Sequence, residues 1–340
     1  MSKKIIKKIF TNTGPKILFK NEKVINKKKL SNIMLHSFGN LNQNKIFYVI
    51  RRSPGAGMFS NLTFVMNHLL IAKQHNFIPV VDMKNFPTIY NEKNIVNGTY
   101  NAWEYYFEKV SKYTLEEVYK SKNVFITNNN FENNMTLELF EKKFNKIKKK
   151  INIKKKLYKE FLKIKKINFK NEQNILGVHF RGTTYKRARG HAFPLNKKLI
   201  RQHIDQLIKK HKYKKIFLVT EEIDYLKFMK KFYNDKLIYT NFFKSKNIDA
   251  FNFYPRKNHR YLLGREIIIE TLLLSISRGL LYVKSNVSSA SNFFSKKEIR
   301  QHEIFLGYNS RNKFISRWLW YLKSILPQFL GGLKNKKKNI

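Results

Sequence analysis

Short apolar runs alternate with amphipathic segments along two stretches of this sequence, and this alternation limits the fold more than any other feature. The longer series starts with ILGVHF at 175–180 and continues through KIFLVTEE, KLIYT and LLYVKS. Each run has the length of a buried strand, and the segments between them favour helices near 196–211, 224–233 and 264–278. The series therefore predicts βαβ units, in which helices connect parallel strands.

The N-terminal half begins in the same way. KIFYVIRR (45–52) predicts a strand, SPGAGMFSN is a glycine-rich turn, an amphipathic helix follows, and FIPVVDM (77–83) predicts the next strand. We therefore expect an α/β protein with two Rossmann-like domains. The predicted segments are an N-terminal extension (1–44), a first domain (45–172) with a basic linker helix from about residue 140, a second domain (173–310) and a basic amphipathic tail (311–340).

Charge and cysteine content restrict the function. The 69 Lys and Arg residues against 22 Asp and Glu give a net charge of +47, which ordinarily indicates a nucleic acid, an anionic membrane or a phosphorylated ligand. The excess runs along the whole chain and no nucleic-acid-binding signature accompanies it, so we predict no specific nucleic-acid partner and keep a basic nucleic-acid-binding protein as an alternative. Because the chain has no cysteine, disulfides, thiolate nucleophiles and cysteine-based metal sites are excluded.

Two features predict the location. The N-terminus is basic and lacks the apolar core and cleavage site of a signal peptide, and the apolar segment 267–283 is interrupted by Glu270 and Arg278. We therefore expect a cytoplasmic protein without a transmembrane helix. In the tail, aromatic and apolar residues have basic flanks, which suits a helix at the inner membrane surface; packing of the tail onto the protein is the equal alternative.

Polar residues follow the first strand of the second half. Ligands of open α/β sheets bind beyond the carboxyl ends of strands, and His179 and Arg181 lie there. Arg181 presents a planar, always charged fork for phosphate oxygens, and Gly182 permits close approach of the backbone. The loop is therefore predicted to bind phosphate; chance clustering in a Lys- and Arg-rich chain is the alternative.

Two further features lie near the end of the second half. Glu270 falls within an apolar helix, where a carboxylate is costly unless it meets a donor. That donor is either another group of the protein or the N–H groups of a bound base. The stretch SNVSSAS, which starts at Ser285, places small hydroxyl and amide side chains after a strand, as at a helix N-terminus that binds phosphate.

Several common motifs are missing. SPGAGMFSN lacks the Gly-Lys-Ser/Thr ending of a P-loop and the third glycine of the dinucleotide fingerprint. Asp-x-Asp, H-E-x-x-H and G-x-S-x-G do not occur. We therefore predict neither a metal site nor a cofactor.

The three elements GAGMFSN, HFRGTTYK and E…SNVSS, in this order, resemble the metal-independent GDP-fucose fucosyltransferases, the superfamily of α1,2-, α1,6- and protein O-fucosyltransferases. The similarity spans roughly residues 45–300. It implies the GT-B architecture, in which two Rossmann-like domains face a cleft and the second binds the donor. It also implies inverting transfer of fucose or a related sugar from a GDP-sugar to a glycan acceptor, in surface polysaccharide synthesis.

The resemblance implies roles for individual residues. Arg181 would be the catalytic residue that stabilises GDP as it leaves. His179 would line the nucleotide pocket, and Glu270 would accept hydrogen bonds from guanine. The other implied donor-binding residues are Gly182, Thr183, Ser285, Asn286, Ser288 and Ser289, and those implied at the cleft are Gly57, Asn61, Lys186 and Arg187.

Two positions depart from the family pattern. Thr184 stands where many relatives carry Asp, and Gly182 stands where the α1,6 enzymes have a second arginine. Lys186, Arg187 or Arg189 could supply the missing charge, and an inactive sugar-nucleotide-binding relative is the second alternative. No residue is identified as the base, because oxocarbenium-like chemistry relies more on leaving-group stabilisation than on a strong base.

Overall fold

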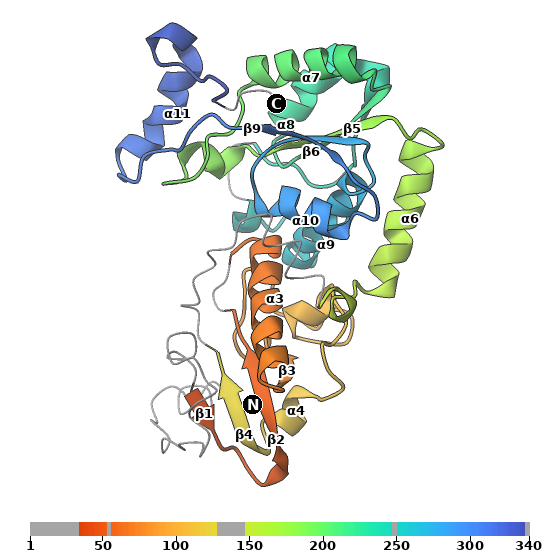
Figure 1. The fold of residues 1–340 in the computed structure, drawn as a ribbon, viewed down its shortest axis with the longest axis vertical. Coiled ribbons are helices and arrows are strands. Elements are labelled where there is room, and N and C mark those ends of the chain that lie inside the picture. Colours follow the sequence, from red (N-terminus) through yellow and green to blue (C-terminus); the bar gives the residue numbers. More distant parts are fainter. Residues whose placement is uncertain (1–33, 53–55, 128–146, 247–249, 337–340) are drawn as a thin grey trace. The chain divides into compact units, whose positions relative to one another are not determined.

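The chain divides into two compact units, residues 1–154 and 155–340 (Figure 1). The computed structural model describes residues 34–52, 56–127, 147–246 and 250–336. Most of the predicted N-terminal extension, the first residues of the predicted linker helix and part of the glycine turn (Ser53, Pro54 and Gly55) lie outside the described residues. Each unit is an α/β structure with parallel strands, so the predicted fold class is confirmed. The facing arrangement of the two domains stays a prediction.

The sheet of the first unit has the strand order β1-β4-β2-β3, in which β2 pairs in parallel with both β3 and β4 and β1 is antiparallel to β4. Strand β2 begins four residues before the predicted start at 45, and β1 lies inside the segment predicted as an extension. The elements are β1 (Met34–His36), β2 (Leu41–Ile50), α3 (Met58–Gln74), β3 (Ile78–Val81), the 3-10 helix Ala102–Tyr105, α4 (Leu115–Val118), β4 (Ser121–Ile126) and the 3-10 helix Lys148–Lys150.

The sheet of the second unit has five parallel strands in the order β7-β6-β5-β8-β9. The chain proceeds from β5 to one edge and then returns to β8 on the other side of β5, so the order reverses between β5 and β8. The elements are α6 (Lys155–Phe169), β5 (Ile175–Phe180), the 3-10 helix Thr183–Arg187, α7 (Lys197–His211), β6 (Lys215–Thr220), α8 (Ile223–Tyr233), the 3-10 helix Asn234–Lys236, β7 (Leu237–Ile238), the 3-10 helix Ala250–Asn252, α9 (His259–Leu274), β8 (Gly279–Val283), α10 (Asn286–Phe294), β9 (Arg300–Ile304), α11 (Ile315–Ile325) and the 3-10 helix Gln328–Leu330.

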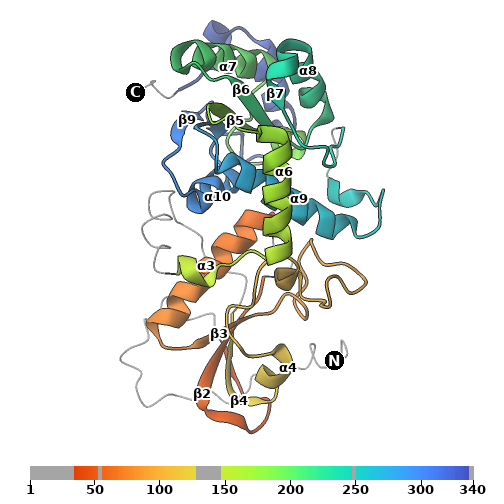
Figure 2. The same ribbon diagram turned by 90° about the vertical axis from the view of Figure 1, so that its right-hand side faces the viewer.

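Helices cover both faces of this second sheet, with α7 and α8 on one face and α9 and α10 on the other (Figures 1 and 2). Side chains alternate along β5, so Leu176, Val178 and Phe180 join the core beneath α7 and α8, while His179 is directed to the opposite face. Helix α6 packs on α9 through an ion pair between Glu160 and Arg265. Helix α6 therefore belongs to the compact unit that starts at residue 155; the predicted domain boundary at 173 stays a prediction.

Helix α11 and the segment after it also belong to the second unit. The Trp320 side chain is only 7% exposed and lies in the main core cluster together with Leu333. Its indole Nε1 donates a hydrogen bond to the Pro194 carbonyl oxygen at 2.8 Å. Within the part of the chain that the structure describes, no helix is both long and apolar enough to cross a bilayer.

We expect Trp320→Ala to lower the free energy of unfolding by about 3–5 kcal/mol, because it removes a large buried side chain and its hydrogen bond. Trp318, two residues earlier, is 71% exposed, so Trp318→Ala is the matched control and should change stability by less than about 0.5 kcal/mol. Denaturant unfolding followed by circular dichroism measures both. Equal effects of the two substitutions would show that the tail is not part of the core.

Candidate functional site

The carboxyl ends of β5 and β8 form the candidate site. Strand order reverses between these two strands, and open α/β sheets bind ligands at such a switch point. His179 is near the end of β5, and Ser285 follows β8. Their side chains meet, with Ser285 Oγ 3.3 Å from His179 Nδ1. Two segments that are far apart in the sequence and that were both predicted to bind the donor are therefore in direct contact.

His179 is buried and uncharged at neutral pH. Burial, reinforced by the charge of Arg181, lowers its pKa from 6.5 to about 3. A neutral imidazole accepts or donates a hydrogen bond at each ring nitrogen without adding charge. His179 therefore positions Ser285 and the start of α10, and Arg181 supplies the positive charge next to it.

The start of α10 is held by a capping box. Ser285 Oγ accepts a hydrogen bond from the Ser288 N–H, and Ser288 Oγ accepts one from the Ser285 N–H. Ser289 Oγ donates to the Ser285 carbonyl oxygen. The donor-binding role of Ser288 and Ser289 stays a prediction, and in the structure both hydroxyls make hydrogen bonds within this helix end. The N–H groups of Asn286 and of the following Val287 remain without a partner among the described residues and give the helix end its capacity for an anion.

Arg181 is the cation of this site. Its guanidinium carbon lies 3.4 Å from the centre of the Tyr185 ring, so the side chain is stacked on an aromatic face. The side chain is half-buried, and it forms no ion pair or hydrogen bond with the described part of the chain. A half-buried guanidinium without a partner of opposite charge is suited to bind an anionic ligand.

The loop that follows Arg181 is held by a buried ion pair. Lys186 Nζ lies 2.8 Å from both carboxylate oxygens of Glu222, and both side chains are nearly excluded from solvent. The Thr183 N–H donates to the same carboxylate at 3.1 Å, and the Thr183 hydroxyl donates to Glu221. The role of Lys186 at the cleft stays a prediction, and in the structure its charge is paired with Glu222.

Glycine at position 182 is required by the same carboxylate. A Cβ atom there would collide with Glu222 Oε2 and come within 3.0 Å of the Phe180 ring. The absence of a side chain at Gly182 therefore makes room for Glu222. This accounts for the glycine without the expected approach of a ligand to its backbone. Arg187 lies on the outer side of the loop, where its guanidinium is 5.6 Å from the centre of the Tyr321 ring in α11.

Glu270 is paired inside the protein. Lys244 Nζ lies 2.9 Å from Glu270 Oε1, the Thr240 hydroxyl donates to the same oxygen, and both side chains of the ion pair are buried. The structure therefore realises the alternative in which the protein supplies the donor. The predicted hydrogen bonding of guanine to this carboxylate is therefore not supported. Glu266 on the same helix is also paired, in its case with Arg256.

In the first unit, the predicted residues shape the glycine turn. Asn61 is buried, and its Oδ1 accepts a hydrogen bond from the Ala56 N–H, while the exposed Gly57 caps the start of α3. Sequence reasoning missed Arg51 and Arg52, which follow β2. The Arg51 guanidinium donates to the Thr127 carbonyl oxygen after β4, so these groups lie at the carboxyl ends of neighbouring parallel strands. The sequence feature that could have identified them is a pair of arginines directly after an apolar run.

Within the described residues, no cluster of three or more His, Asp or Glu side chains is arranged to bind a metal ion. No family model and no curated protein matches the sequence. Fucosyltransferase NodZ from Bradyrhizobium is similar in structure, with 15% identity, a TM-score of 0.48, and 74% of this chain and 94% of NodZ covered. POFUT1 in complex with GDP is 9% identical, with a TM-score of 0.44 and coverage of 77% and 99%.

The buried state of His179 predicts a pH effect. As the pH falls below 6.5, the unfolded chain takes up a proton on this residue that the folded protein does not bind until about pH 3. Stability should therefore fall as the pH falls through this window. In His179→Gln, the slope should be smaller by up to about 1.4 kcal/mol per pH unit. Denaturant unfolding of both proteins between pH 4 and pH 7 measures it, and parallel curves would contradict the assignment.

The Glu270–Lys244 pair predicts a second stability effect. Lys244→Met leaves a buried carboxylate without its counter-charge and should cost about 3–5 kcal/mol. The double variant Lys244→Met with Glu270→Leu should recover most of this loss, because both charges are then removed. Unfolding free energies of the two single variants and the double variant form the cycle. Additive losses would show that the two side chains do not interact.

Proposed function

We propose that this protein is an inverting, metal-independent glycosyltransferase that transfers fucose, or a related sugar, from a GDP-sugar to a glycan acceptor. The proposal is carried by the switch-point arrangement, in which the stacked, half-buried Arg181 has no anionic partner among the described residues and the Ser285–His179 contact holds the start of α10. A diphosphate fits this arrangement because it offers oxygens to a guanidinium fork and to helix N–H groups at once.

The guanosine and fucose parts of the proposal come from the motif resemblance, as does a role in surface polysaccharide synthesis. A cytoplasmic location stays a prediction from the sequence. The side chains support the diphosphate part. Because Glu270 is paired with Lys244, the proposal assigns base recognition to no single carboxylate. The preference for GDP over UDP and ADP is therefore to be measured by calorimetry on the wild-type protein.

In the proposed reaction, the bond between the sugar and the diphosphate breaks, and its electron pair remains on the diphosphate oxygen. An acceptor hydroxyl attacks the anomeric carbon from the opposite face, which inverts the configuration, and the hydroxyl proton passes to solvent water. Arg181 and the N–H groups at the start of α10 stabilise the charge that develops on the leaving diphosphate. His179 stays neutral during turnover at physiological pH, because burial holds its pKa near 3.

Arg181→Ala should lower the turnover number by at least about 100-fold, because it removes the fixed charge that stabilises the leaving group. Arg278→Ala is the matched control, since this exposed arginine lies just before β8, at the amino end of a strand whose carboxyl end forms the candidate site. Its loss should change turnover less than twofold. Release of GDP from GDP-fucose, with and without acceptor glycans, is the assay. A folded Arg181→Ala protein with near-normal turnover would disprove the assignment.

The same assay separates the proposal from its alternatives. Excess chelator should leave the rate nearly unchanged, because Arg181 and helix N–H groups take the place of a divalent cation; activity that requires manganese would contradict this mechanism. A protein that binds GDP but never releases it from any GDP-sugar would be the inactive relative. A protein that binds no nucleoside diphosphate would contradict the site itself.

A further inference from the structure

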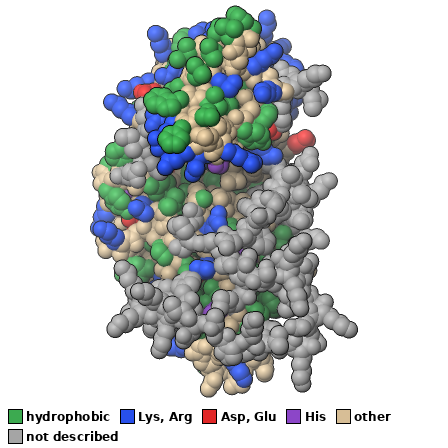
Figure 3. Space-filling view, turned by 90° about the vertical axis from the view of Figure 1, so that its left-hand side faces the viewer, with side chains coloured by type: hydrophobic (Ala, Val, Ile, Leu, Met, Phe, Trp, Pro, Cys, Tyr) green, Lys and Arg blue, Asp and Glu red, His purple; other side chains and the backbone are tan. Residues whose placement is uncertain are grey.

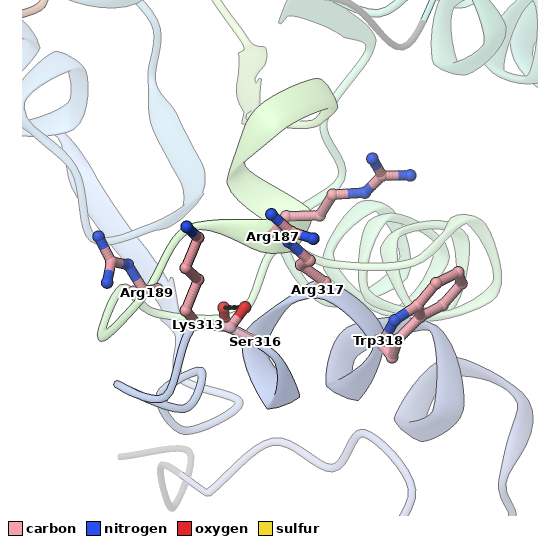
Figure 4. Close-up of a pocket in the computed structure, with 6 residues that line it drawn as sticks. All are labelled: Arg187, Arg189, Lys313, Ser316, Arg317 and Trp318. Atoms are coloured by element: carbon pink, nitrogen blue, oxygen red, sulfur yellow. Dashed lines mark hydrogen bonds between the residues drawn. The ribbon is translucent and has the colours of Figure 1, made fainter.

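A basic pocket of about 440 Å³ lies between the loop after β5 and the start of α11. Its lining comes from two segments that are more than 100 residues apart in the sequence. Figure 4 shows cationic side chains from both segments around it, with Trp318 at one end. The lining residues are Arg187, Arg189, Lys313, Ser316, Arg317 and Trp318.

The four cations of this pocket lack a counter-charge in the part of the chain that the structure describes. None of them pairs with a carboxylate in the described part of the chain, and the sequence from 304 to 340 contains no Asp or Glu. Like charges that share one cavity repel each other, and a bound anion relieves this repulsion. The pocket is therefore suited to a phosphate or another compact anion.

The helix beside the pocket exposes an apolar face. Ile315, Trp318, Leu322 and Ile325 follow one another at spacings of three and four residues, which places them along one side of α11. All four are exposed, and Ile325 is 82% accessible. The space-filling view shows hydrophobic side chains gathered in the upper part of the second unit, with Lys and Arg side chains at their border (Figure 3).

Packing of α11 onto the core does not use these apolar residues. The opposite side of α11 is already packed, since Ser316 and Trp320 are buried and Trp320 lies in the main core cluster. The helix is thus fixed in place with a second apolar face directed to solvent. Exposed apolar faces with basic borders are characteristic of surfaces that bind membranes.

We propose that the basic pocket and the exposed face of α11 together form a docking surface for an anionic phospholipid bilayer. Phosphate headgroups occupy the pocket, and the apolar stripe enters the boundary between headgroups and acyl chains. Charge and apolarity select this occupant together. A free anion or a nucleic acid would leave the stripe uncovered, and an uncharged apolar partner would leave the four cations unneutralised. The proposed glycosyl transfer relies on Arg181 and the start of α10, which do not line this pocket. Arg187, which the resemblance places at the cleft, is left unchanged in every variant of the test below.

The test measures binding of the full-length protein, without donor, to vesicles of phosphatidylcholine alone or with phosphatidylserine, in about 0.15 M salt. We expect binding to the anionic vesicles only. Arg189→Gln, Lys313→Gln and Arg317→Gln together should weaken it about 100-fold, because each basic side chain at such a surface contributes roughly fivefold. The matched control carries Lys156→Gln, Lys159→Gln and Lys163→Gln on the exposed side of α6. It has the same net charge and should weaken binding less than about threefold.

A second variant tests the apolar stripe. Trp318→Ser with Ile325→Ser keeps every cation, and it should weaken vesicle binding at least about tenfold and abolish the blue shift of tryptophan emission. Near-ultraviolet circular dichroism verifies that each variant is folded. If the triple variant of the pocket and the triple variant of α6 lose equal vesicle affinity, binding depends on the charge of the whole chain and the proposal is overturned.

Three other outcomes would also overturn it. The first is unchanged binding by the variant that lacks Trp318 and Ile325. The second is absence of binding by the wild-type protein, as expected if another segment of the chain or a second copy covers the face. The third is capture of inorganic phosphate or of a short RNA by the pocket while anionic vesicles do not compete.

Discussion

The buried ion pair between Lys186 and Glu222 is the interaction on which the candidate site depends. The carboxylate binds the lysine ammonium and also the Thr183 N–H, so it fixes both ends of the short helix that follows β5. The Lys186 carbonyl oxygen accepts a hydrogen bond from the Asn309 side chain, which connects the tail to the same loop. Because loss of one partner of such a pair costs about 3–5 kcal/mol, the loop backbone is held firmly. Arg181 can then keep its position on the Tyr185 ring without an internal anion.

The carboxylates of this chain are few, and the structure shows how the second unit uses them. Buried or half-buried glutamates pair with cations at several places, as Glu222, Glu266 and Glu270 illustrate. With 22 acidic residues against 69 basic ones, an unpaired cation on the open surface carries little information. An unpaired cation that is half-buried, such as Arg181, or that shares a pocket with three others is informative, because its charge is costly without a ligand.

The strand and helix runs of the second unit were predictable because each has a clear period and length, as 175–180 and 215–220 show. Strands β1, β4 and β9 were missed, since β1 is short and the other two mix polar and apolar residues. The strand-end rule placed His179 in a ligand site, but its direct contact with Ser285 was not predicted. The partners of Lys186 and Glu270 did not follow. They lie 36 and 26 residues away in the sequence, and no local pattern indicates which of many lysines reaches which carboxylate.

The space at Gly182 has a consequence for the evolution of this loop. A side chain at position 182 and a carboxylate at position 222 cannot occupy the same volume, and a lysine at position 186 is costly without that carboxylate. The residues at these three positions therefore depend on one another. A larger residue at 182, such as a second arginine, displaces the Glu222 carboxylate from its place beside Lys186, so the three positions should covary when sequences of related proteins are aligned.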